Sequence, residues 1–355
     1  MSEVPATGAT KGHVSSVRLP HAWFVACASK ELGAAPRSCT LQDTPLVLFR
    51  GEGGRPAALL DRCPHRNLPL SLGKVTEGTL QCGYHGWRFS PDGHCVAIPG
   101  LLGELHAKAR QAQAFACREE DGFVWVYSTP GVEPSSEPFR FPCLDDTRYS
   151  TVRRQLRVKA TMHATVENAL DVPHTAFLHG GLFRTARKKH DIEVVVRRTP
   201  QMAEAEYIGE PRPQGLLGKV LAPRGGVVMH VDRFILPCVA QVEYRLGEGS
   251  HLLVTSAMTP VSDFETVVNA VVTFRLPVPG WLVRPLLTPV GLRVFRQDAE
   301  VLARQTEAIL RFGGEQYAST ELDVLGQQVW RLLKQASRGE APTEELYEHR
   351  LRMRV

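Results

Sequence analysis

The sequence lacks the features that define several large classes of protein. No apolar run is long enough to span a bilayer, because the best stretch, 281–295, is short and contains two arginines and two prolines. The polar segment 1–13 has no apolar core of a signal peptide, which predicts a cytoplasmic protein. Basic residues exceed acidic ones by only five, 42 against 37, so the charge gives no nucleic-acid signature.

Repeats, low-complexity tracts and nicotinamide or flavin fingerprints are also not evident. Disulfides are not expected in a reducing compartment, although the sequence contains eight cysteines. With thirteen histidines also present, the interpretations left for the cysteines are metal ligation and burial as free thiols. The spacing of these residues has to decide between them.

The first third of the chain has the pattern of a β domain. Short apolar runs at 46–49, 57–60 and 123–127 are separated by turns rich in glycine and proline. Such runs predict a small sandwich or barrel. From 129 to 142 the composition shifts to proline, serine, glycine and glutamate, which indicates a linker between two domains.

The second part of the chain has a mixed pattern. A helical segment at 158–170 is followed by strand-like stretches, and two long helical patterns close the sequence. Strands in succession with helices late predict an antiparallel sheet covered by C-terminal helices, an α+β fold. The strands are expected at 192–197, 227–235, 239–244, 251–258 and 266–274, and the late helices at 291–312 and 321–336.

Two Cys-His pairs form the first candidate metal site. Cys63 and His65 are spaced Cys-x-His, and after sixteen residues Cys82 and His85 are spaced Cys-x-x-His. Two thiols and two imidazoles suit a structural zinc ion. They also suit a [2Fe–2S] cluster in which two histidines bind one of the irons. The glycine- and proline-rich loops, the aromatic residues of the second loop and the lack of a following helix favour the cluster.

The sequences CPHR at 63–66 and CGYHGWRF at 82–89 resemble the two ligand loops of a Rieske domain. The resemblance implies that Cys63 and Cys82 bind one iron of the cluster, and that His65 and His85 bind the other. The remaining cysteines are interpreted as core or surface thiols; they are Cys27, Cys39, Cys95, Cys117, Cys143 and Cys238.

A second group of ionisable residues follows the predicted linker. Glu167, Asp171 and His174 are spaced by four and three residues, which predicts one face of a helix. Burying such a stripe is costly unless its members are paired or bound to metal. His179 follows five residues after His174, so the helix is expected to end or bend there. From the residues alone, a metal site and hydrogen-bonded core histidines are equally acceptable interpretations.

This segment resembles the Glu/Asn-x3-Asp-x2-His-x4-His pattern of Rieske oxygenase α subunits. The resemblance implies that His174 and His179 bind a mononuclear non-haem iron. It also implies that Asp171 connects the two metal centres of neighbouring subunits. Glu167 would lie near the iron, in a role that is less defined because some members of the family have asparagine there.

The third iron ligand is expected on the helical pattern at 291–312. A facial triad consists of two histidines and one carboxylate, and Asp298 is the charged member of a mostly apolar stripe. Glu300 lies on the opposite, solvated side and is the alternative ligand. The predicted core-facing stripe consists of Phe295, Asp298, Leu302, Gln305 and Ile309.

By this resemblance the chain is a terminal oxygenase of the homotrimeric monooxygenase and demethylase branch. The implied organisation is a flexible N-terminus (1–16), an all-β Rieske domain (17–130), a linker (131–150) and a catalytic domain of helix-grip, START-like fold (151–355). The resemblance also implies that O₂ is the co-substrate, and that electrons come from a separate ferredoxin or flavin-dependent reductase.

The expected reaction is hydroxylation, or oxidative demethylation, of a bulky apolar substrate such as a sterol, polycyclic or aromatic compound. Apolar pairs suggest the pocket wall; they are 216–217, 220–221, 281–282 and 286–287, with Val290. The alternatives are an aromatic-ring dioxygenase, an electron carrier, and a lipid-binding module without oxygenase activity. A basic cluster at 184–189 is a less favoured candidate for a docking site of an acidic ferredoxin, the alternative being a solvated loop.

Overall fold

The computed structural model describes residues 13–103, 105, 108–179, 190–211, 228–247, 249–340 and 346–354. The chain forms two compact units, Arg18–Pro142 with Thr259–Ser262, and the remainder of the chain. The exact boundaries expected at 17–130, 131–150 and 151–355 stay predictions. Within the described residues, no helix is both long enough and apolar enough to cross a membrane.

The N-terminal unit consists of three small antiparallel sheets, as its short apolar runs predict. Their strand orders are β1-β11-β10, β2-β3-β4-β9 and β5-β6-β7-β8. The strands are β1 (Trp23–Ala28), β2 (Arg37–Leu41), β3 (Thr44–Arg50), β4 (Pro56–Leu60), β5 (Lys74–Thr76), β6 (Thr79–Gln81), β7 (Arg88–Phe89), β8 (Cys95–Ala97), β9 (Ala114–Phe115), β10 (Cys117–Glu120) and β11 (Phe123–Tyr127).

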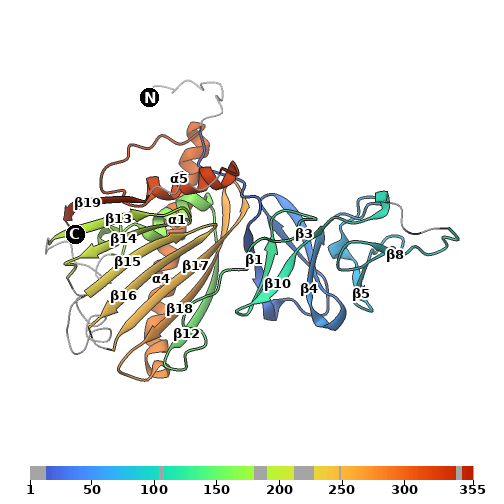
Figure 1. Cartoon of the computed structure of the whole chain (residues 1–355), viewed down its shortest axis with the longest axis horizontal. Helices are drawn as coiled ribbons and strands as arrows, with labels where there is room; N and C mark the ends of the chain where they lie inside the picture. Colours follow the sequence, from blue (N-terminus) through green and yellow to red (C-terminus); the bar gives the residue numbers. More distant parts are fainter. Residues whose placement is uncertain are drawn as a thin grey trace, which may run out of the picture. The chain divides into compact units, whose positions relative to one another are not determined.

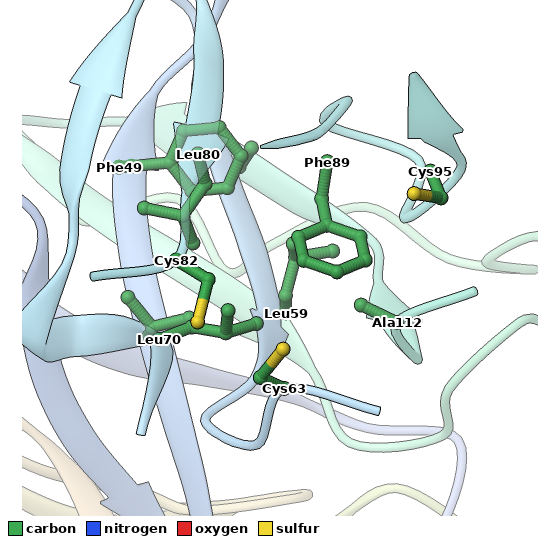
Figure 2. Packing of buried hydrophobic residues seen from close by; sticks show 11 residues of the cluster. Phe49, Leu59, Cys63, Leu70, Leu80, Cys82, Phe89, Cys95 and Ala112 are labelled. Atoms are coloured by element: carbon green, nitrogen blue, oxygen red, sulfur yellow. The ribbon is translucent and has the colours of Figure 1, made fainter. Parts of the chain in front are cut away.

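The two Cys-His loops leave this scaffold at β4 and β6. One runs from the end of β4 to β5, and the other joins β6 to β7. Gly73 ends the first loop, where a Cβ atom would lie 2.0 Å from the carbonyl oxygen of Gln81. Only glycine allows the backbones to approach this closely. The loops therefore lie against each other over one hydrophobic core, part of which Figure 2 shows.

The C-terminal unit is built on one eight-stranded sheet, in the order β12-β18-β17-β16-β15-β14-β13-β19 (Figure 1). The predicted α+β fold is thereby confirmed. Each predicted strand of this region corresponds to an observed one, although the first position of the strand predicted at 227–235 lies outside the described residues. The strands β12, β14 and β19 were not predicted. The strands are β12 (Ser150–Val158), β13 (Asp191–Arg198), β14 (Met202–Ile208), β15 (Val228–Ile235), β16 (Val239–Leu246), β17 (His251–Ser262), β18 (Glu265–Arg275) and β19 (Tyr347–Arg354).

In the described part of this unit, four helices accompany the sheet: α1 (Met162–Leu170), α2 (Thr175–Leu178), α4 (Gly280–Phe312) and α5 (Gly326–Ser337). The predicted helix at 158–170 is wrong at its start, because Val158 ends β12 and the Thr161 side chain caps α1 through the Ala164 amide. The helix predicted at 291–312 begins earlier, since α4 accommodates two prolines in its first turns. It ends where Gly313 adopts a left-handed conformation.

Candidate active site

Asp171, His174 and His179 surround the short helix α2. The helix α1 ends at Leu170, Asp171 is extended, His174 precedes α2 and His179 follows it. The expectation that Glu167, Asp171 and His174 share one helical face is therefore wrong. Pro173 explains the break, because the residue before a proline is disfavoured in helical conformation. The break turns both imidazoles toward one point.

The two histidines converge on Asp298 of α4. The Nε2 atoms of His174 and His179 are 3.3 Å apart, and Asp298 Oδ1 lies 3.5 Å and 3.0 Å from them. Two ligand atoms at right angles on a metal with bonds of about 2.1 Å would be about 3 Å apart. Asp298 Oδ1 is also buried without a hydrogen bond of ordinary geometry to any described residue. The donor set and its spacing therefore fit one iron(II) ion.

Both imidazoles are oriented through their other ring nitrogen. His174 Nδ1 lies 3.2 Å from Asp171 Oδ2, and His179 Nδ1 lies 3.1 Å from Gln297 Oε1. Hydrogen bonds of this kind fix the tautomer and the direction of a metal-binding histidine. Sequence reasoning did not give Gln297 a role. The only feature of the sequence that could have identified Gln297 is its position directly before Asp298.

The electrostatics of His174 follow from its surroundings. Burial by itself lowers the pKa of His174, but the neighbouring carboxylates of Asp171 and Asp298 outweigh burial and raise the pKa to about 9. A carboxylate on each side thus gives this imidazole a strongly negative environment. Such an environment attracts a divalent cation as well as a proton.

The exposure of side chains along α4 distinguishes the two candidate carboxylates. Asp298 is partly buried and lines the cavity described below, whereas Glu300 is exposed. The predicted stripe is wrong at Gln305, which is exposed, while Thr306 is buried between Leu302 and Ile309. Because an α-helix has 3.6 residues per turn, the buried face shifts from position 305 to position 306 at this turn.

The four predicted cluster residues come together in the N-terminal unit. Cys63 and Cys82 are buried members of its core, and Figure 2 shows them on a different side of Phe89 from Cys95. The rings of His65 and His85 have centroids 4.5 Å apart. The two thiols neighbour each other, and so do the two imidazoles, which agrees with a cluster that has two cysteine and two histidine ligands.

The surroundings of these residues also fit a cluster. Burial, together with the neighbouring Cys82, raises the pKa of the Cys63 thiol to about 11. A buried thiolate needs a positive partner such as iron. His65 Nδ1 is buried without a hydrogen-bond partner in the described part of the chain. The indole of Trp87 stacks on the His65 ring at 4.7 Å and holds its orientation.

A cavity of about 670 Å³ opens beside the candidate iron ligands. Alternate residues of the sheet form one wall, as Ala240 and Val242 of β16 illustrate, and Val290 and Phe295 of α4 form part of another. The walls are mostly apolar, and the size suits a ligand of several rings.

Of the pocket residues predicted from the sequence, only part can be located. Val290 lines the cavity, but Trp281 and Leu282 do not, and Trp281 is 71% exposed. The pairs 216–217 and 220–221 and the basic cluster at 184–189 lie outside the described residues, as do the side chains at 286–287.

Glu167 lies apart from the cavity wall. A Cβ atom on Gly326 at the start of α5 would be 1.9 Å from Glu167 Oε1, so the carboxylate packs against this helix. Burial, followed by the charges of Asp323 and Asp171, raises the pKa of Glu167 to about 7. Its neighbour Asn168 lines the cavity instead. A role for Glu167 near the iron stays a prediction.

Family models match both units. The Rieske [2Fe–2S] domain matches residues 22–105, and the vanillate O-demethylase oxygenase C-terminal domain matches residues 158–339, just over half of the chain. The chain belongs to the Rieske non-haem iron oxygenase family. The family carries a [2Fe–2S] cluster and a mononuclear iron, which agrees with the two ligand sets described above.

Individual relatives match to different extents. The dicamba O-demethylase oxygenase component of Stenotrophomonas maltophilia is 37% identical over 180 residues, 50% of this chain and 52% of that protein. The vanillate O-demethylase oxygenase subunit of Pseudomonas sp. is 26% identical over 346 residues, 88% of this chain and 93% of that protein. Dicamba monooxygenase bound to dicamba is a solved structure with a TM-score of 0.75 and 25% identity, over 91% of this chain and 98% of that one.

Some matched segments cover less than two thirds of the curated relative. They span 52% of the dicamba enzyme and 21% of chlorophyllide a oxygenase from Chlamydomonas reinhardtii. Family and fold therefore follow from the matches, whereas activity, substrate and partners of this chain are matters for proposal.

Proposed function

We propose that the chain is a terminal oxygenase that uses O₂ and externally supplied electrons to hydroxylate, or oxidatively demethylate, an aromatic substrate. The convergence of His174, His179 and Asp298 beside a large apolar cavity carries this proposal. A pure electron carrier has no use for this second site. A lipid-binding module with a degenerate metal site would not keep all three ligands together.

Each proposed ligand has a definite part in the mechanism. Cys63, Cys82, His65 and His85 would hold the cluster, and His174, His179 and Asp298 the iron. When bound, the cluster supplies electrons one at a time and the iron activates O₂. The protein's own contribution is to orient the two iron-binding imidazoles through Asp171 and Gln297. The cavity walls hold the substrate beside them and exclude water.

The substrate class is supported by the cavity and by the relatives. The apolar walls and the volume suit a compound of one to several rings. The relatives are named for O-demethylation of dicamba and of vanillate. Ring dioxygenation is the second candidate, because the same ligands would serve it and one relative is a 3-chlorobenzoate-3,4-dioxygenase oxygenase subunit.

The partners we infer are a separate ferredoxin or flavin-dependent reductase and further copies of this chain in a homotrimer. The relatives are named as oxygenase components or subunits, which implies other components. Within the cluster loops, Leu72 and Tyr84 are 68% and 63% exposed and suit contact with another protein. We also infer a cytoplasmic location, where a reducing environment would keep the eight cysteines free of disulfides.

The proposal is tested with purified protein reconstituted with a reductase. We expect about three irons per chain, two in the cluster and one at the second site. We also expect O₂-dependent formation of hydroxylated or demethylated products from a panel of methoxyarenes. About two irons per chain and no product would leave an electron carrier as the better description.

Replacing Asp171 tests the orienting role separately. We expect Asp171→Asn to keep both iron sites loaded but to lower turnover about 10- to 100-fold, because His174 loses its charged partner. Iron content, the cluster spectrum and initial rates measure this outcome. Asp146→Asn is the matched control, since Asp146 pairs only locally with Arg148 in an exposed loop. Equal turnover in the two variants would contradict the role of Asp171.

A further inference from the structure

The first half of α4 exposes apolar side chains that the proposed mechanism does not use. Trp281 is 71% exposed and Leu282 is 54% exposed, and Val278, just before the helix, is 42% exposed. Pro285 and Pro289 are exposed as well. Single apolar residues on a surface are ordinary, but a group of them on one helix marks an interaction site.

These side chains lie on one face of the helix. Exposed positions recur every three or four residues, which is one stripe along an α-helix. On the other side Val283 is buried, and Thr288, Leu292 and Phe295 line the substrate cavity. The helix runs along the sheet (Figure 1), with one face to the cavity and the other to solvent. The exposed stripe, called the outer face of α4 below, consists of residues 281, 282, 285, 289, 293 and 296.

Packing of the first turns fixes the direction of the outer face. A Cβ atom on Gly280 would lie 1.8 Å from Ser150 Oγ, so the backbone of α4 lies directly against the start of β12. One turn later, Arg284 donates a hydrogen bond of 2.5 Å to the carbonyl oxygen of Thr151. Because these contacts set the rotation of the helix, Trp281 cannot turn inward. Its exposure is therefore a built feature of the fold.

The charge along this part of the chain has one sign. Residues 266–297 contain no aspartate or glutamate but four arginines, at 275, 284, 293 and 296. The last three are exposed, and none of them forms an ion pair with a described residue. Asp146, shortly before β12, is neutralised by Arg148. The outer face thus combines apolar side chains with unneutralised positive charge.

This composition is typical of helices that lie in the interface of a membrane. Aromatic and aliphatic side chains enter the acyl region there, while arginines stay at anionic headgroups. A second copy of the chain suits the outer face less well, because a stable protein interface involves about 20–30 residues on each side. Another copy would also bring the same positive net charge, +5.

We propose that the outer face of α4 binds the surface of an anionic lipid membrane. Trp281 and Leu282 insert among the lipids, and the arginines of the same face contact the headgroups. The substrate cavity then lies behind the helix that touches the phase in which apolar ring compounds accumulate. This advantage for substrate capture rests on the function proposed above, whereas the membrane binding itself does not.

The test is co-sedimentation of the full chain, with both metal centres loaded, with lipid vesicles. We expect binding to vesicles of phosphatidylcholine and phosphatidylglycerol in equal parts, weakening as salt rises, and much weaker binding to phosphatidylcholine alone. Trp281→Ser should reduce binding roughly tenfold, because it removes the largest inserted side chain. The double variant Arg293→Gln/Arg296→Gln should reduce binding roughly 20-fold, and only to the anionic vesicles.

The same helix offers matched controls outside its outer face. Phe312 is 74% exposed at the other end of α4, and Arg304 is exposed but pairs with Glu307. Phe312→Ser and Arg304→Gln should therefore bind vesicles like the unaltered chain.

Tryptophan fluorescence reports insertion directly. Trp281 is exposed, whereas the other four tryptophans are buried or partly buried. The emission of the unaltered chain should shift to the blue when vesicles are added. Trp281→Phe keeps a large apolar ring, so it should still bind but lose this shift.

Two results would overturn the inference. One is no binding of the unaltered chain to the anionic vesicles, and the other is unchanged binding in both Trp281→Ser and the double arginine variant. If vesicles do not bind and light scattering shows that Trp281→Ser dissociates an oligomer, the outer face belongs to a subunit interface instead.

The test does not depend on a single variant or on turnover. If Trp281→Ser does not fold, as judged from the cluster absorption, the double arginine variant still decides, because it changes only exposed side chains. Failure to bind vesicles would leave the proposed oxygenase standing, and absence of product would leave the membrane binding standing. The two failures are therefore distinguishable.

Discussion

Asp298→Ala is expected to remove the mononuclear iron while leaving the cluster intact. The iron content should fall from about three to about two per chain, with no change in the visible absorption of the cluster. The remaining pair, His174 and His179, is joined through one short helix and offers only two nitrogen ligands. Turnover should fall below detection, beyond the roughly 100-fold loss that removal of an orienting neighbour causes.

Glu300→Ala provides the matched control. Glu300 lies on the same helix but is exposed, so this variant should keep three irons and full turnover. The variant Asp298→Glu provides an intermediate case. Its carboxylate is on a longer side chain and can reach the iron site with altered geometry, so iron binding should be weakened less than in Asp298→Ala. Full iron retention in Asp298→Ala, or loss of iron in Glu300→Ala, would assign the carboxylate ligand to a different residue.

The contrast between Asp298 and Glu300 illustrates what periodicity can predict. A charge on an apolar stripe of a helix stands out in the sequence, and the structure places that charge beside two histidines. The same reasoning failed for the face shared by Glu167, Asp171 and His174, because Pro173 ends the helix. The spacing in the sequence identified the candidate ligands. The break between α1 and α2, however, orients the imidazoles toward one point, and spacing alone did not predict it.

Contacts that depend on the pairing of distant strands were beyond the reach of the sequence. In the cavity wall, Glu210 and His230 are twenty positions apart, and only the register of β14 with β15 brings them together. The edge strand β19 was missed for a related reason. Its charged residues resemble a solvated tail, but Arg350 and Arg354 pair across to acids of β13.

Cys82→Ser is expected to eliminate the cluster and to destabilise the N-terminal unit. A serine hydroxyl is a hard ligand, whereas iron–sulfur clusters prefer soft thiolates. Iron should fall from about three to about one per chain, and the visible absorption should disappear. The cluster links two loops over one core, so its loss should lower the melting temperature by roughly 10 °C or more. Absorption spectra, iron analysis and calorimetry measure the three effects.

Cys95→Ser distinguishes loss of a ligand from damage to the core. Cys95 belongs to the same hydrophobic core and is as buried as Cys82 (Figure 2). Its thiol donates a hydrogen bond to the Ala97 carbonyl, at 3.8 Å. Its replacement places a smaller hydroxyl in an apolar position and should cost about 1–2 kcal/mol of stability. The cluster spectrum and the iron content should stay unchanged. If both variants lost the cluster, core packing rather than ligation would explain the effect of Cys82→Ser, and the assignment of Cys82 would lose its support.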